Sequence, residues 1–331
     1  MTPVAVLRAK VAPLPLSERD EQLIRTTGIY RFLTAMDVWQ LMRPVSKSTI
    51  RERLRWLAER QFLCRFPLPS PGRGVKPQVY TLGVKGRQVL GLEGYFRPSR
   101  IPRISYSHLW HALTLTRCCV CASLLSPAFT ISELQLSYEM GVEPPRVRGS
   151  INGKEHHVPV IPDAFLYFVR SDGEQRPVLL EIDRGTSGGR RVKAALHARI
   201  ELITSGEYAR YFGTEAVRIA YLTTSGAARR DALERWACDV IAAAISDKKH
   251  REGWMEKFFF IAWDYDKLFD KALWTDPLWQ CPAFETTVPL LPPLPPHNKE
   301  TTHGHTPETT NPGKALAAHC HQTRASRNCA E

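Results

Sequence analysis

The chain has 331 residues, of which 43% are apolar, and a formal net charge of +12. It contains no run of about eighteen apolar residues, and its N-terminus lacks the basic, apolar and small-residue succession of a secretion signal. We therefore expect a cytoplasmic protein with no membrane partner. Residues 1–100 hold 18 Lys and Arg against 7 Asp and Glu. This uneven charge favours a polyanion partner for the N-terminal part, although a solvated basic face would give the same count.

Three helices are predicted between residues 17 and 57. Ser17 is suited to cap the first helix, and Thr34 the second, which Pro44 ends. In the third helix, apolar residues at i, i+4 and i+7 form an inner stripe. The polar side chains of the other face are those predicted to contact DNA: Lys47, Thr49, Arg51 and Arg55.

A basic hairpin is predicted after the third helix. Residues 61–66 and 78–82 have the period-two pattern of paired strands, and a Pro/Gly-rich loop joins them. Arg73 and Lys76 lie near the tip of this loop. Three helices followed by such a hairpin resemble a winged helix-turn-helix, in which the third helix enters the major groove and the wing touches the backbone. A winged helix used for protein contacts is the alternative.

The whole chain is predicted to be an α+β protein. We expect an N-terminal extension (1–16), a winged helix (17–95), a linker (96–106), a mixed α/β domain (107–285) and a disordered Pro/His-rich tail (286–331). The helix expected over 107–125 carries two histidines one turn apart. His108 is expected to pack or cap, and the role of His111 stays open.

Carboxylates gather at the end of a predicted hairpin in the second domain. Strands over 158–170 and 178–183 flank a turn at Asp172-Gly173, a strong hairpin signal. Residue numbers paired across this turn sum to 344 or 345, so Asp163 should lie opposite Glu181 or Ile182. Glu181 and Asp183 are two residues apart and should project from one face. Three converging carboxylates favour a hard divalent cation, so these three are predicted to bind Mg²⁺ or Mn²⁺.

The pattern Pro-Asp, hairpin, Glu-x-Asp resembles the PD-(D/E)xK nuclease core, a restriction-endonuclease-like fold. In such a site the metal polarises the scissile phosphate and orients a water. The chain departs from this motif because Asp183 stands where the motif has a Lys. The missing positive charge is expected from Arg184 or Lys193. The alternatives are a degenerate core without cleavage, and salt bridges from the carboxylates to Arg184, Arg190 and Arg191.

Three short strings of this sequence resemble the replication-relaxation family of plasmid and conjugative-element proteins. They are His111-Ala-Leu, Pro162-Asp163-Ala164 and Glu181-Ile-Asp-Arg-Gly-Thr186. The resemblance covers residues 20–265 in the order of elements. It implies DNA binding, and it implies that Asp163, Glu181 and Asp183 are metal ligands in nicking, as in the family's mobilisation relaxases. The resemblance also accounts for Asp183 at the position where the nuclease motif has a Lys, because the family is similar there.

Two functions remain open on the sequence. The first is a DNA-binding protein of a plasmid or conjugative element that nicks double-stranded DNA by a metal mechanism, with Asp163, Glu181, Asp183 and Lys193 as catalytic residues. The second is a non-catalytic replication accessory or transcriptional regulator with a degenerate nuclease core. Other replication or mobilisation proteins are expected partners in either case, and a scaffold that binds an acidic protein is the weaker third interpretation.

Overall fold

The computed structural model describes residues 16–68, 77–92, 105–140, 143–151 and 154–294. It contains both helices and mixed sheets, so the predicted α+β class is confirmed. No helix in these ranges is both long enough and apolar enough to cross a lipid bilayer.

The N-terminal residues form the predicted order of three helices and a hairpin. The elements are α1 (Glu18–Tyr30), β1 (Leu33–Thr34), α2 (Ala35–Leu41), α3 (Lys47–Glu59), β2 (Leu63–Pro67), β3 (Gln78–Leu82) and α4 (Val84–Val89). Ser17 and Thr34 each accept a hydrogen bond from the third backbone N–H of their helix, which confirms both predicted caps. The short strand β1, which the sequence analysis missed, joins the hairpin to make a sheet of order β1-β3-β2.

A five-stranded mixed sheet forms the centre of the second part, with the order β10-β9-β8-β7-β4. Strands β8, β9 and β10 are parallel, whereas β7 pairs antiparallel with both β8 and β4. The bounds are β4 (Phe129–Leu136), β7 (Ala164–Arg170), β8 (Gln175–Asp183), β9 (Arg218–Thr223) and β10 (Phe258–Ala262). The carboxyl ends of the three parallel strands therefore lie at one edge of the sheet.

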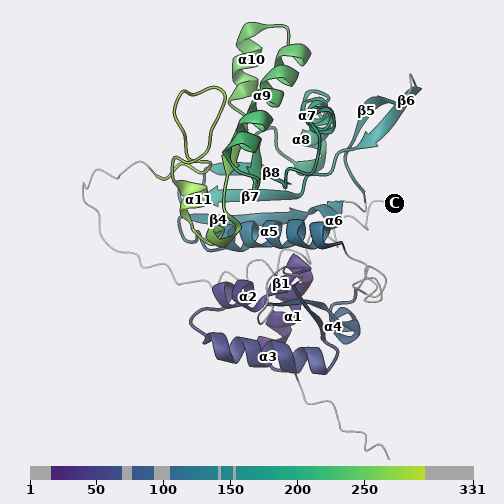
Figure 1. Ribbon diagram of the computed structural model, residues 1–331, viewed down its shortest axis with the longest axis vertical. Coiled ribbons are helices and arrows are strands. Elements are labelled where there is room, and N and C mark those ends of the chain that lie inside the picture. The colour runs from purple at the N-terminus through teal and green to yellow at the C-terminus, as the bar shows by residue number, and fades with distance from the viewer. Residues whose placement is uncertain (1–15, 69–76, 93–104, 141–142, 152–153, 295–331) are drawn as a thin grey trace, which may run out of the picture.

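Helices cover both faces of this sheet (Figure 1). On one face lies α5 (Tyr106–Ser123), which separates the sheet from the N-terminal helices. On the other lie α7 (Gly189–Thr204), α8 (Glu207–Phe212), α9 (Ala227–Ala244) and α10 (Lys248–Met255). Alternate residues of each strand pack into different cores: Leu180 and Ile182 on the α5 side, Leu179 on the α7 side.

Two regions differ from the predicted pattern. A hairpin of β5 (Arg146–Ile151) and β6 (Lys154–Pro159), which was not predicted from the sequence, projects from the body (Figure 1). The short helices α6 (Ser137–Met140) and α11 (Ala272–Thr275) and a 3-10 turn (Tyr265–Lys267) complete the fold.

The predicted tail begins too early, because Leu290 and Leu291 are fully buried. Their apolar side chains pack despite the surrounding prolines, and 295–331 lie outside the described residues.

The N-terminal helices are joined to the sheet through α5. Asp37 of α2 is fully buried, and its Oδ1 lies 3.4 Å from Arg117 Nε of α5. The guanidinium of Arg117 also stacks on the ring of Tyr265, 3.9 Å from its centroid. Nearby, the hydroxyls of Tyr30 and Ser123 are 3.0 Å apart. One arginine therefore holds three separate segments of the chain together.

Replacing Arg117 with Ala should destabilise the fold by about 3–5 kcal/mol, because it leaves the Asp37 carboxylate buried without its cation. The measurement is the free energy of unfolding in denaturant. Arg235→Ala, which removes an exposed arginine of α9, serves as the control and should change stability by less than about 0.5 kcal/mol. Equal stability of the two variants would contradict this role for Arg117.

Candidate functional site at the end of strand β8

The hairpin of β7 and β8 places two of the predicted site residues opposite each other. Ala164 pairs with Leu180 in the antiparallel register, so the next position outward joins Asp163 and Glu181. These residue numbers sum to 344, as the turn at Asp172-Gly173 predicted. Asp163 comes directly before β7, and Glu181 is the third residue from the end of β8.

Asp163 is held between helix α5 and strand β8. Its Oδ1 lies 3.0 Å from Nε2 of His111, and its Oδ2 accepts a 2.8 Å hydrogen bond from the backbone N–H of Ile182. Burial lowers the pKa of His111, but the hydrogen bond and negative charge of Asp163 outweigh it, so the net pKa is raised. The open question of His111 is thus answered: it is the partner of Asp163.

Glu181 is buried against helix α7. Its Oε1 accepts a 2.7 Å hydrogen bond from Nε of Arg199, and Nη2 of the same arginine contacts it as well. Burial raises the pKa of Glu181 to about 7, because desolvation and the negative charge of Asp163 outweigh the stabilising charge of Arg199. Arg199 was not among the residues predicted from the sequence, although its position three residues after Leu196 on the apolar face of the helix was a signal.

Asp183 ends β8 and is bound by helix α9. Arg229 donates to both carboxylate oxygens, with distances of 2.9 and 2.7 Å. The Thr223 hydroxyl and the backbone N–H of Gly185 donate to Oδ2. Burial raises the pKa of Asp183, but these donors outweigh it and the net pKa is lowered. Gly185 has a φ of +69° and no space for a Cβ beside Ser225, so the turn requires glycine there.

The structure places the expected sources of positive charge elsewhere. Lys193, predicted as a catalytic residue, forms an ion pair with Asp239 of α9 at 2.7 Å. Arg184 reaches across to Ser107 of α5, whose backbone oxygen accepts a 2.5 Å hydrogen bond. The cations beside the carboxylates are Arg199 and Arg229, because α7 and α9 present their arginines to the strand end and Lys193 faces the neighbouring helix.

The carboxylates as arranged do not fit a divalent cation. Each one has a different partner within the protein: Asp163 contacts His111, Glu181 pairs with Arg199 and Asp183 pairs with Arg229. A hard metal ion needs several carboxylate oxygens turned toward one point. Within the described ranges, no three His, Cys, Asp or Glu side chains are grouped in a way that could hold a metal.

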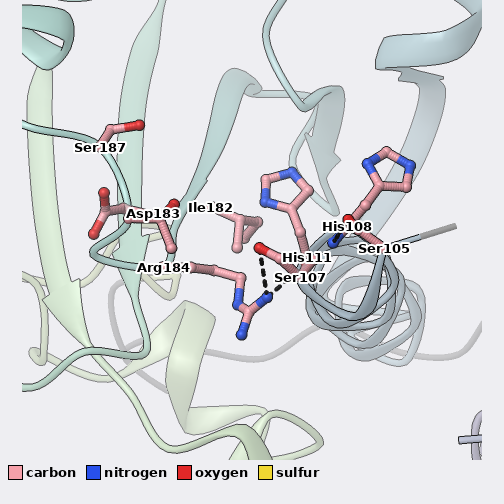
Figure 2. Close-up of a pocket in the computed structure, with 9 residues that line it drawn as sticks. Ser105, Ser107, His108, His111, Ile182, Asp183, Arg184 and Ser187 are labelled. Atoms are coloured by element: carbon pink, nitrogen blue, oxygen red, sulfur yellow. Dashed lines mark hydrogen bonds between the residues drawn. The ribbon is translucent and has the colours of Figure 1, made fainter. Parts of the chain in front are cut away.

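An open polar cleft of about 340 Å³ lies between the end of β8 and α5. Figure 2 shows Arg184 extending from the strand end toward Ser107, with the His111 ring close to them and His108 farther out. The residues that line the cleft are Ser105, Ser107, His108, His111, Ile182, Asp183, Arg184, Thr186 and Ser187.

The residues predicted to contact DNA lie mainly on the outer face of α3. Ile50, Leu54 and Leu57 are fully buried, as the inner stripe predicted. The outward side chains Lys47, Thr49, Arg51 and Arg55 are all exposed. Arg73 and Lys76 of the predicted wing lie outside the described residues.

The raised pKa of Glu181 predicts a pH dependence of stability. A carboxyl with a higher pKa in the folded state binds its proton more tightly there than in the unfolded chain. The stabilisation that Glu181 gives to the folded state is therefore complete below about pH 4.5 and is lost as the pH rises toward 7. Over this range the free energy of unfolding should fall by about 1–3 kcal/mol more in the wild type than in Glu181→Gln. Parallel pH profiles of the two proteins would contradict the raised pKa.

The ion pairs also predict the response to metal. Millimolar Mg²⁺ or Mn²⁺ should leave the melting temperature of the protein unchanged, because a ligand stabilises a fold only by binding it. Asp163→Ala serves as the matched variant in the same thermal melts. A rise in melting temperature with Mn²⁺ that disappears in Asp163→Ala would show that the carboxylates exchange their protein partners for metal.

Comparison with known protein families matches residues 28–217 to the family described as replication-relaxation. No curated protein and no solved structure matches the chain. The family match begins in α1 and ends just before β9, so it includes α3, α5 and the carboxylate hairpin. It covers more than half of the 331 residues and confirms the resemblance found in the sequence. The chain belongs to the replication-relaxation family.

Proposed function

We propose that this protein binds duplex DNA through helix α3 and acts in DNA replication or relaxation as a non-catalytic accessory protein. The observation that carries the proposal is the outer face of α3, which exposes Lys47, Arg51 and Arg55 on one helix. Neither Arg51 nor Arg55 has an ion-pair partner among the described residues, so both charges are available to phosphates.

The surrounding elements support this use of α3. The order of three helices and a hairpin is that of a winged helix, in which the third helix is the one that enters the major groove. The opposite face of α3 is anchored by Ile50, Leu54 and Leu57, so the helix presents its cations on a rigid support. Lys47 and Arg43 both stack on the Trp39 ring, with their charged groups 4.2 and 4.0 Å from its centroid.

Cutting of DNA is not part of the proposal. Metal-dependent nicking by Asp163, Glu181 and Asp183 would require Arg199 and Arg229 to leave their carboxylates first. For the buried Glu181–Arg199 pair, removing one partner costs about 3–5 kcal/mol, which the metal would have to offset. A role in a plasmid or conjugative element, and binding to other replication or mobilisation proteins, are likewise proposals, and they rest on the family resemblance.

The double variant Arg51→Ala/Arg55→Ala should weaken binding to duplex DNA by about tenfold or more, because it removes two phosphate contacts. The slope of log affinity against log salt should become shallower by about 2. Fluorescence anisotropy of a labelled duplex across a salt series measures both quantities.

The control is Arg235→Ala/Lys249→Ala, which removes the same charge from exposed positions on α9 and α10. These helices lie at the opposite end of the molecule from α3 (Figure 1). Equal loss of affinity in both double variants would mean that net charge, and not α3, determines the binding. Absence of duplex binding by the wild type at low salt would refute the proposal.

A further inference from the structure

We propose that the cleft between β8 and α5 is a second, separate binding site that takes a phosphate group, with Arg184 as its principal ligand. The phosphate could belong to a nucleic-acid backbone or to a free phosphate or nucleotide, since both present the same oxygens. This inference goes beyond the proposed use of α3, because none of the cleft residues lies on that helix.

Arg184 is the cation of this cleft that has no acidic partner among the described residues. Its Nη1 donates to the backbone oxygen of Ser107 at 2.5 Å and to the Ser107 hydroxyl at 3.3 Å. Its Nε and Nη2 donate to none of the described residues. A guanidinium has five N–H donors in a planar fork. The contact with Ser107 fixes Nη1, and the edge formed by Nε and Nη2 stays free to bind a phosphate through two hydrogen bonds.

The carboxylates nearby have partners of their own, and two of them are paired with arginines, so they do not cancel the charge of Arg184. Asp183, which also lines the cleft, is bound by Arg229 through two hydrogen bonds. Asp163 is bound by His111, and Glu181 by Arg199. Because these carboxylates already have partners, the unpaired charge that remains in the cleft is that of Arg184, which attracts an anion.

The rest of the lining supplies neutral hydrogen-bond donors. Hydroxyls of Ser105, Ser107, Thr186 and Ser187 surround the cleft. The exposed ring of His108 lies at its outer side (Figure 2). Hydroxyls and imidazole N–H groups around one arginine are typical contacts of phosphate oxygens.

The test uses the full chain carrying Arg51→Ala/Arg55→Ala, so that binding at α3 does not interfere. Two probes distinguish the sources of phosphate: inorganic phosphate, and a single-stranded thymidine hexanucleotide. Isothermal titration measures each affinity with and without Arg184→Ala. Loss of a charge-assisted bidentate contact should weaken binding by about tenfold or more.

Further variants separate ligand binding from folding. Arg184→Lys keeps the charge without the fork and should give an intermediate affinity. Ser107→Ala retains the backbone oxygen that positions Arg184 and should weaken binding less than Arg184→Ala. Arg191→Ala removes an exposed arginine that does not line the cleft, and it should bind like the parent. Thermal melts of all variants check that they fold.

Each outcome decides the inference. Binding of inorganic phosphate that depends on Arg184 supports a site for free phosphate, and binding of the hexanucleotide alone supports a site for nucleic-acid backbone. If neither probe binds the parent, the cleft is not a phosphate site. The inference also fails if Arg184→Ala and Arg191→Ala bind equally. Neither failure affects the α3 proposal, which the duplex experiment tests with the wild-type chain.

Discussion

Three carboxylates lie at the end of one hairpin, and each is bound by a side chain from a different helix. These contacts determine how the helices of the second part pack against the sheet. Burying a carboxylate costs several kcal/mol unless a cation and hydrogen bonds compensate it. Here His111 of α5, Arg199 of α7 and Arg229 of α9 each bind one of them. Three helices from both faces of the sheet are thereby tied to the same strand end. The position of α5 matters further, because Arg117 of that helix joins the sheet to the N-terminal helices.

The same arrangement gives each carboxylate of the nuclease-like pattern a partner within the protein. A motif records residue types and spacing along the chain, and both are present in Asp163, Glu181 and Asp183. Metal binding depends in addition on which positive groups the neighbouring helices present. Arg199 and Arg229 lie 18 and 46 residues along the chain from Glu181 and Asp183, and they form ion pairs with these carboxylates. The hairpin brings Asp163 and Glu181 opposite each other as the motif predicts, and metal binding by the carboxylates stays a prediction.

The structure could be predicted from the sequence where the interaction that determines it joins residues close together in the chain. Ser17 and Thr34 act on their own helices, the Asp172-Gly173 turn sets the register of β7 and β8, and the α3 stripe follows helical spacing. It could not be predicted where the interacting residues are far apart in the chain. Nothing close to Lys193 indicates that Asp239 pairs with it, and nothing close to Leu290 indicates that this proline-flanked segment packs in the core. Such contacts depend on the tertiary arrangement that brings the partners together.

The two proposed sites also differ in the way that they expose their charge. On α3 the arginines stand on an open helix face, which suits the proposed contact with many phosphates of a long duplex. In the cleft, Arg184 is half-buried and oriented by Ser107, so it is suited to one phosphate in one position. The proposed duplex binding thus relies on an open basic helix, and the proposed phosphate binding relies on an oriented arginine in a polar cleft.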